Sequence, residues 1–149
     1  MPIQILIVDD SPISRQDLRR ICELAGYFEV VGQAENGREA VALVRDLQPD
    51  IVLMDIEMPI MDGVQATRLI TAQNPSTRVI ALATCIKSER VLPVIKAGAY
   101  GCLPKDTEEG ILIEAIRAVH RGEALIDSHV TARVFDELRR IDEGLTPSS

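Results

Sequence analysis

Short runs of apolar residues alternate along the chain with longer segments whose apolar positions recur at helical spacing. The runs are rich in β-branched residues, which is typical of buried strands. They predict five strands, at residues 3–8, 29–34, 51–54, 78–83 and 101–104. The segments that follow them predict helices at residues 12–26, 37–47, 63–73, 91–97 and 108–120. This alternation indicates a parallel sheet with crossover helices.

Turn and cap residues set the expected ends of these helices. Ser11 offers an N-cap to the first helix, and Pro12 suits its first position. Thr107 is expected to cap the fifth helix, and a glycine at position 122 to end it. Because Pro93 has no backbone N–H to donate, we expect the fourth helix to begin late, near Val91, or to be bent and loosely held.

Five β/α units with right-handed crossovers predict an α/β fold with an open, doubly wound sheet. We expect the flavodoxin-like arrangement, a five-stranded parallel sheet in the order 2-1-3-4-5, with its binding crevice between strands 1 and 3. Residues 123–149 form a separate piece, a C-terminal linker helix followed by a loop-like end. Either Asp127 or Ser128 can cap that helix. We therefore expect one domain at residues 1–122 and an appended helix after it.

Carboxylates stand at the ends of two predicted strands. Asp9 and Asp10 follow the first strand, and Asp55 follows the third. These ends meet at the crevice, where three gathered carboxylates repel one another unless a cation joins them. Mg²⁺ suits such a site because it binds carboxylates and keeps several waters. Lys105, at the end of the fifth strand, adds a positive charge, so the group suits phosphoryl transfer to Asp55 as nucleophile.

Charge and composition narrow the range of partners. A net charge of −7 and a pI of about 4.8 make the chain a poor nucleic-acid binder, because phosphate contacts need clustered Lys and Arg. No stretch approaches about 20 consecutive apolar residues, and no signal-peptide pattern opens the chain. Cys22, Cys85 and Cys102 stand singly, so we expect buried, reduced thiols. These features predict a cytoplasmic protein that contacts no membrane.

Three blocks of sequence carry a family resemblance. They are Ile-Leu-Ile-Val-Asp-Asp ending at Asp10, Met-Asp-Ile-Glu-Met-Pro-Ile-Met-Asp-Gly from Met54, and Ala-Gly-Ala-Tyr-Gly-Cys-Leu-Pro-Lys-Asp from Ala97. On these blocks, residues 3–122 resemble the CheY-like receiver domain of a two-component response regulator of the NarL/FixJ type. The Leu-Thr-Pro at residues 145–147 resembles the opening of the LuxR-type helix-turn-helix domain of that subfamily. We therefore expect a truncated piece of a longer regulator rather than a natural stand-alone receiver.

The resemblance implies a role for each residue of the acidic group. Asp55 is implied as the phosphoacceptor. Asp10, Asp55 and the backbone carbonyl of Glu57 are implied as Mg²⁺ ligands, and Asp9 is implied to act through a water molecule. The implied phosphoryl donor is a phosphohistidine of a sensor histidine kinase.

The phosphoryl group itself is implied to contact Lys105 and backbone N–H groups near Glu57 and Thr84. Two positions depart from the family pattern, because the switch hydroxyl falls on Ala83 and the switch aromatic on Cys102. Thr84 would supply the hydroxyl only if the strand end shifted by one residue, which turns a side chain to the other face. We therefore expect a weaker activating change, or one carried by the loop and helix after the fourth strand.

Signalling is expected through a conformational change or through homodimerisation, with the fifth helix and the first as the candidate surface. DNA would be contacted only through the missing C-terminal domain. One alternative is a pseudo-receiver, a protein-binding module that signals without phosphorylation, which Ala83 and Cys102 favour. Another is an aspartate-nucleophile phosphatase, but Glu57 stands where its acid/base aspartate belongs and no cap-sized insertion is present. We therefore do not expect a turnover enzyme.

Overall fold

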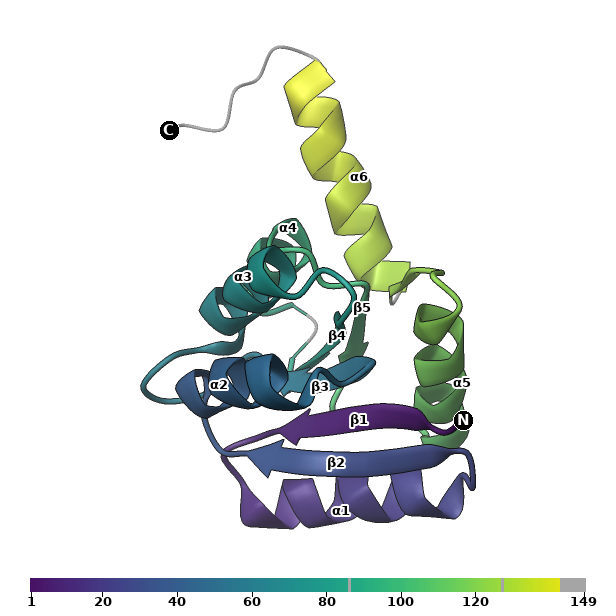
Figure 1. Cartoon of the computed structure of the whole chain (residues 1–149). Coiled ribbons are helices and arrows are strands. Elements are labelled where there is room, and N and C mark those ends of the chain that lie inside the picture. The colour runs from purple at the N-terminus through teal and green to yellow at the C-terminus, as the bar shows by residue number, and fades with distance from the viewer. Residues whose placement is uncertain (86, 127, 143–149) are drawn as a thin grey trace.

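The strands form one parallel sheet in the order β2-β1-β3-β4-β5-β6 (Figure 1). The computed structural model describes residues 1–85, 87–126 and 128–142. The strands are β1 (Ile3–Val8), β2 (Phe28–Ala34), β3 (Ile51–Asp55), β4 (Arg78–Ala83), β5 (Gly101–Pro104) and β6 (Leu125–Ile126). The helices are α1 (Pro12–Leu24), α2 (Gly37–Leu47), α3 (Gly63–Gln73), α4 (Val91–Lys96), α5 (Glu109–His120) and α6 (Ser128–Asp142).

Helices cover both faces of the sheet. In β1, Ile5 and Ile7 pack against α1 and α5, whereas Leu6 and Val8 pack against α2 and α3. All of these side chains are buried, which explains why the strand is a continuous apolar run instead of an alternating one. The predicted five-stranded order 2-1-3-4-5 is confirmed. A two-residue strand, β6, pairs with the outer edge of β5 and was not predicted.

The predicted helix ends are confirmed in part. α4 begins at Val91 as expected, and this start places Pro93 in the first turn, where a missing N–H breaks no intrahelical bond. α1 ends at Leu24, earlier than predicted. The prediction that Thr107 caps α5 was wrong, since Glu108 occupies the cap position. The backbone N–H of Thr107 instead donates to the carbonyl of Pro104 at 3.1 Å, in a turn that follows β5.

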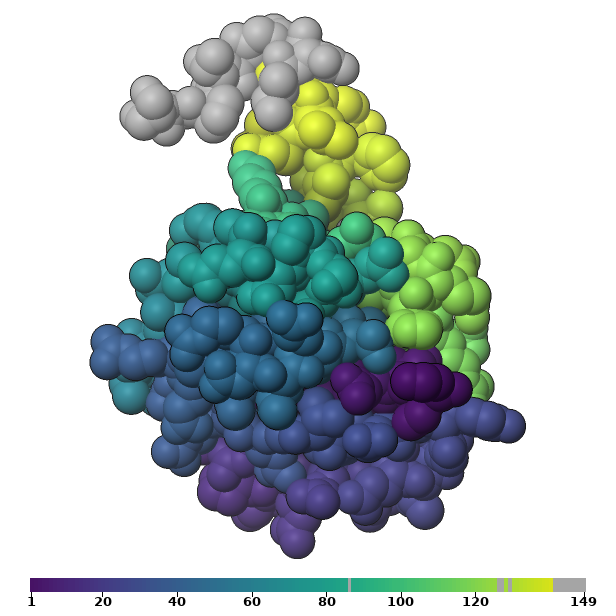
Figure 2. All heavy atoms as spheres, in the orientation of Figure 1, coloured from purple at the N-terminus to yellow at the C-terminus, as the bar shows by residue number. Residues whose placement is uncertain are grey.

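α6 packs on α4 at one end of the molecule and extends beyond it (Figures 1 and 2). Val130 of α6 is fully buried, in an apolar cluster with Val91 and Val94 of α4. Further along the two helices, Nζ of Lys96 lies 3.4 Å from Oε1 of Glu137. The apolar contact and the ion pair together attach the predicted linker helix to the α4 side of the sheet.

α6 begins at Ser128, one of the two residues expected to cap it. Ser128 is the first residue of α6 and so does not occupy the cap position before it. Asp127, the other candidate cap, and the Leu-Thr-Pro at 145–147 lie outside the described residues. Across the part of the chain that is described, no helix is both long and apolar enough to cross a membrane.

Candidate functional site

Asp55 ends β3 as a buried carboxylate, with only 2% of its surface exposed. Its Oδ1 accepts a hydrogen bond from the backbone N–H of Glu57 at 3.0 Å. Burial raises the pKa of Asp55 to about 6, a rise that the Glu57 N–H and the charge of Lys105 partly oppose and the carboxylate of Asp9 adds to. A raised pKa together with burial marks this carboxyl group as a candidate for chemistry.

Asp9 ends up beside Asp55 because β1 and β3 are neighbours in the sheet. It is fully buried, and its Oδ1 accepts a hydrogen bond from the backbone N–H of Ser11 at 2.9 Å. Its Oδ2 lies 2.9 Å from Nζ of Lys105, yet accepts no hydrogen bond of good geometry from the described residues. A buried oxygen in that state is a ready ligand for a hard cation.

Asp10 is exposed and completes the acidic group. One carboxylate oxygen from each of Asp9, Asp10 and Asp55 lies within 4.8 Å of the other two. Three carboxylates, two of them buried and one reachable from solvent, fit an open Mg²⁺ site in which the cation keeps several waters. The structure therefore brings together the three carboxylates that the sequence predicted.

Lys105 supplies the positive charge of the site. The residue follows β5, and its backbone N–H donates to the carbonyl of Ala83 at 2.8 Å, which fixes where the side chain starts. Its Nζ lies 2.9 Å from Oδ2 of Asp9 and 3.4 Å from Oδ2 of Asp55. Burial alone lowers the pKa of Lys105, but the contacts with Asp9 and Asp55 outweigh this and raise the pKa above its usual value. The ammonium group therefore stays charged at neutral pH.

Glycine at position 63 allows α3 to begin directly against the backbone of Asp55. A Cβ at Gly63 would lie 2.5 Å from the carbonyl oxygen of Asp55 and 2.6 Å from Cα of Ile56. Asp62 caps α3, because its Oδ1 accepts from the backbone N–H of Gln65 at 3.0 Å. The Asp-Gly pair of the second sequence block thus has a structural reason that the sequence analysis did not identify.

The loop before α3 contains a tight turn and is hydrogen-bonded to α2. The backbone N–H of Met61 donates to the carbonyl of Pro59 at 2.8 Å, and Ile60 between them has φ of 70°. This is a γ-turn with a β-branched residue in the left-handed region, which is a strained arrangement. The carbonyl of Met61 in turn accepts from the backbone N–H of Gly37 at 3.0 Å. The backbone of Glu57 contacts Asp55. The segment that follows Glu57 is therefore restrained both by the turn at Ile60 and by the hydrogen bond from α2.

The departures from the family pattern lie on the α4 side of the site. Ala83 and Cys102 are both buried in the apolar cluster that contains Val130. Thr84 is exposed just after β4, and its side chain makes no hydrogen bond to any described residue. Its predicted role in phosphate binding stays a prediction. Cys85 is exposed, so the expectation of three buried thiols was wrong for this residue, which lies in the loop after β4 rather than in an apolar strand.

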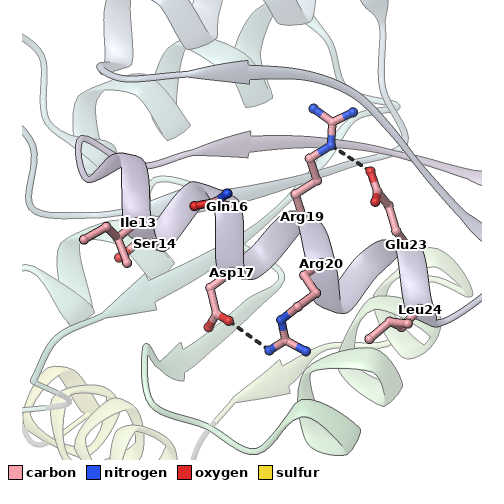
Figure 3. Close-up of a pocket in the computed structure, with 8 residues that line it drawn as sticks. All are labelled: Ile13, Ser14, Gln16, Asp17, Arg19, Arg20, Glu23 and Leu24. Atoms are coloured by element: carbon pink, nitrogen blue, oxygen red, sulfur yellow. Dashed lines mark hydrogen bonds and ion pairs between the residues drawn. The ribbon is translucent and has the colours of Figure 1, made fainter.

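Arg15 is a site neighbour that the sequence analysis missed. Its Nη1 donates to the backbone carbonyl of Asp9 at 2.6 Å. The other arginines of α1 instead form surface ion pairs: Arg19 with Glu23 at 2.7 Å, and Arg20 with an aspartate on the same helix (Figure 3). The sequence alone does not show which of the three arginines contacts the site, since all belong to one helix with charged residues on several faces.

An open groove of about 780 Å³ follows the outer face of α1, but it contains none of the site carboxylates (Figure 3). A smaller hollow, of about 330 Å³, lies between α1 and the segment that joins β5 to α5, and Lys105 lines it. The chemistry therefore belongs to the ends of β1, β3 and β5, and the groove on α1 is a separate surface feature.

Comparison with known families and proteins agrees with this geometry. A family model described as the response regulator receiver domain matches residues 5–117. The chain is 38% identical over 138 residues to the transcriptional regulatory protein LnrK of Bacillus subtilis (strain 168), and 40% identical over 139 residues to the transcriptional regulatory protein DegU of Brevibacillus brevis. Each match covers 93% of this chain. The chain spans only 63% of LnrK and 59% of DegU.

Solved structures with the same fold include a LuxR-family two-component response regulator from Aurantimonas sp. SI85-9A1. It has a TM-score of 0.83 and 31% identity, over 92% of this chain and 98% of that one. Another is CheY of Borrelia burgdorferi, solved in a complex with CheX, BeF3 and Mg. That match has a TM-score of 0.73 and 29% identity, over 80% of this chain and 90% of that one.

Proposed function

Because the chain belongs to the response regulator receiver domain family, we propose that it accepts a phosphoryl group on Asp55 from a phosphohistidine of a sensor histidine kinase. The observation that carries this proposal is the contact of the buried Asp55 carboxylate with Lys105, beside two further carboxylates. At pH 7 a carboxyl group with a pKa of about 6 is mostly ionised, so Asp55 is available as a nucleophile.

In the transfer, a carboxylate oxygen of Asp55 forms the new P–O bond. The P–N bond to the donor imidazole breaks, and the nitrogen keeps the electron pair and takes up a proton. Lys105 neutralises charge on the phosphoryl oxygens, because its ammonium group already lies 3.4 Å from Asp55. The backbone N–H of Glu57 holds the other Asp55 oxygen in place. Slow loss of the phosphoryl group to water would return the carboxylate without a conventional turnover reaction.

Mg²⁺ fits the residues present. Asp10, Asp55 and the backbone carbonyl of Glu57 would hold it, and Asp9 would act through a bound water. When bound, the cation would offset the negative charge of the carboxylates and of the incoming phosphate. The CheY structure solved with BeF3 and Mg supports this assignment by family.

We further propose that the phosphorylated domain signals to a transcriptional output through a conformational change or homodimerisation. The relatives named above are transcriptional regulators, and any DNA contact would belong to the part of such proteins that this chain does not span. Residues 1–122 act as the receiver in this proposal, and the rest as a linker. Exposed apolar side chains on two helices, Ile13 of α1 and Ile111 of α5, support a dimer surface there.

A cytoplasmic location is part of the same proposal, because Cys85 is an exposed thiol outside any disulfide, and such thiols are usual in the reducing cytosol. The alternative, a receiver that signals without phosphorylation, is favoured by Ala83 and Cys102, which lack the switch groups. It gives no reason for a lysine held between two buried carboxylates, so we favour phosphorylation.

Incubation with acetyl phosphate, with and without Mg²⁺, tests the function. Intact-protein mass spectrometry should detect one added phosphoryl group in wild type with Mg²⁺, and none in Asp55→Asn. Asp46→Asn is the matched control, because it changes an exposed aspartate on α2 that pairs only with Arg45 among the described residues. An adduct that persists in Asp55→Asn, or the absence of one in wild type, would contradict the proposal.

A further inference from the structure

Arg15 reaches from α1 back to the end of β1, where it contacts backbone rather than a carboxylate. Its Nη1 lies 2.6 Å from the carbonyl oxygen of Asp9, which is a short, charge-assisted hydrogen bond. We propose that Arg15 is a positioning residue for the acidic group, holding the peptide between Asp9 and Asp10 so that both carboxylates face the Mg²⁺ site. This inference rests on the proposed function, because it assigns the residue to the same site.

Three hydrogen bonds restrain Asp9, two through its backbone and one through its carboxylate. Its N–H donates to the carbonyl of Ala34 in β2 at 3.0 Å, and its Oδ1 accepts from the N–H of Ser11 at 2.9 Å. The hydrogen bond from Arg15 to the Asp9 carbonyl is the only one of these contacts that a side chain of α1 donates. Because that carbonyl belongs to the peptide that leads into Asp10, the contact restrains the orientation of the exposed Asp10 carboxylate as well as that of the buried Asp9.

Charge alone does not account for the placement of Arg15. A guanidinium hydrogen-bonded to the backbone of Asp9 brings positive charge to this end of β1, which opposes the binding of Mg²⁺ because like charges repel. Among the described residues Arg15 also pairs with no carboxylate, whereas Arg19 on the same helix pairs with Glu23. The geometric role and the charge therefore predict opposite changes when Arg15 is replaced, which makes the two separable by experiment.

Replacement of Arg15 by glutamine removes both the charge and the hydrogen bond. If positioning dominates, Mg²⁺ binding should weaken on the order of tenfold, the size usual for residues that orient metal ligands. If charge dominates, Mg²⁺ binding should tighten. Isothermal titration calorimetry with MgCl₂ gives the dissociation constant directly. Arg15→Lys keeps the charge and a hydrogen-bonding ammonium group, and should recover part of the lost affinity.

Arg19→Gln is the matched control, because it removes the same charge from the same helix without touching Asp9. Its Mg²⁺ affinity should stay within twofold of wild type. A second measurement needs no metal: the backbone amides of Asp10 and Ser11 should exchange with D₂O several times faster in Arg15→Gln than in wild type or Arg19→Gln. Thermal midpoints of the variants show whether a loss of affinity is merely a loss of fold.

The inference is overturned if Arg15→Gln binds Mg²⁺ as tightly as wild type or more tightly, or if Arg19→Gln weakens binding equally. It is also overturned if amide exchange at Asp10 and Ser11 is unchanged. Should Arg15→Gln fail to fold, Arg15→Lys carries the test, with a weakening of two- to threefold expected and no change contradicting the inference. Failure of the proposed function gives a different result, since wild type would then neither bind Mg²⁺ nor acquire a phosphoryl group.

Discussion

The ammonium group of Lys105 lies closer to Asp9, at 2.9 Å, than to the proposed phosphoacceptor, at 3.4 Å. Asp9 is fully buried, so this ion pair compensates a charge that would otherwise be costly. Lys105 therefore neutralises carboxylates that a bound metal cation would also contact, and the proposed contact of Lys105 with phosphate would come in addition to this ion pair.

Lys105→Gln should separate these two roles. Loss of the ammonium group should tighten Mg²⁺ binding, because a competing cation is gone, and should raise the pKa of Asp55 above its value of about 6. Phosphorylation at pH 7 should nevertheless fall at least tenfold, since charge on the transferring group is no longer offset. Calorimetry and the mass-spectrometric assay measure the two effects. Lys96→Gln, at an exposed lysine of α4, should change neither the Mg²⁺ affinity nor the extent of phosphorylation. If Lys105→Gln lowered both the Mg²⁺ affinity and phosphorylation, the two proposed roles of Lys105 would be contradicted.

The raised pKa of Asp55 predicts a pH dependence of stability. Between the ordinary carboxyl pKa of about 4 and the folded value of about 6, the folded protein binds more protons than the unfolded chain, so stability falls as pH rises. Asp55→Asn removes this penalty. It should raise the free energy of unfolding at pH 7 by about 1–3 kcal/mol and bring no gain at pH 4. Urea titrations at both pH values without Mg²⁺ test this, and an equal gain at both would contradict it.

The ionisation of Asp55 should also be visible directly in an NMR titration. In the metal-free protein, the midpoint of Asp55 ionisation should lie at a pH of about 6. Mg²⁺ should move this midpoint to lower pH, because a cation favours the charged form of the carboxyl group. The ¹³C chemical shift of the Asp55 carboxyl carbon, followed from pH 3 to 9, reports the midpoint directly. A midpoint near 4 in the metal-free protein would show that burial does not perturb this group.

Gly63 and Gly110 form a matched pair for backbone substitution. A Cβ at Gly63 would lie 2.5 Å from the carbonyl oxygen of Asp55, whereas one at Gly110 in α5 would meet nothing within 4 Å. Gly63→Ala should cost about 2–3 kcal/mol of stability and impair phosphorylation, because the backbone that carries the nucleophile must move. Gly110→Ala should gain about 0.5–1 kcal/mol through helix propensity. Thermal and chemical unfolding measure both, and equal effects would be inconsistent with the close approach.

Val130 and Leu138 allow the docking of α6 to be tested. Val130 is fully buried against α4, whereas Leu138 is 51% exposed. Val130→Ala should cost about 1–2 kcal/mol and speed amide exchange throughout α6, because two buried methyl groups are lost. Leu138→Ala should have little effect on either measurement.

Cys102 lies in the same apolar cluster as Val130. Cys102→Ala should leave phosphorylation unchanged in the mass-spectrometric assay, since position 102 carries no switch aromatic.

The sequence predicted the clustering of the carboxylates because their positions follow from topology. Once β1 and β3 are neighbours, Asp9 and Asp55 must meet at one edge of the sheet, and Lys105 joins them from the end of β5. Such convergence depends on strand order alone. It needs no knowledge of side-chain rotamers.

Features that depend on side-chain direction or on a few local hydrogen bonds were not predictable in this way. Arg15 is one of three arginines in a single helix, and only the folded structure shows which of them turns toward the backbone of Asp9. Thr107 satisfies the usual preference for a cap, yet its N–H is used in a turn before α5 begins. The two-residue β6 is too short for a periodic signal of its own.

The packing of α6 has a consequence for anything that would approach the α4 side of the domain. The small side chains of Ala83 and Cys102 lie in one apolar cluster with Val130, so the C-terminal helix is already seated over them. A helix tethered to the domain has a high effective concentration at this surface. An external protein would therefore bind there with its intrinsic affinity multiplied by the fraction of time that α6 is away from this surface. α6 therefore competes with any external partner for the α4 side of the domain.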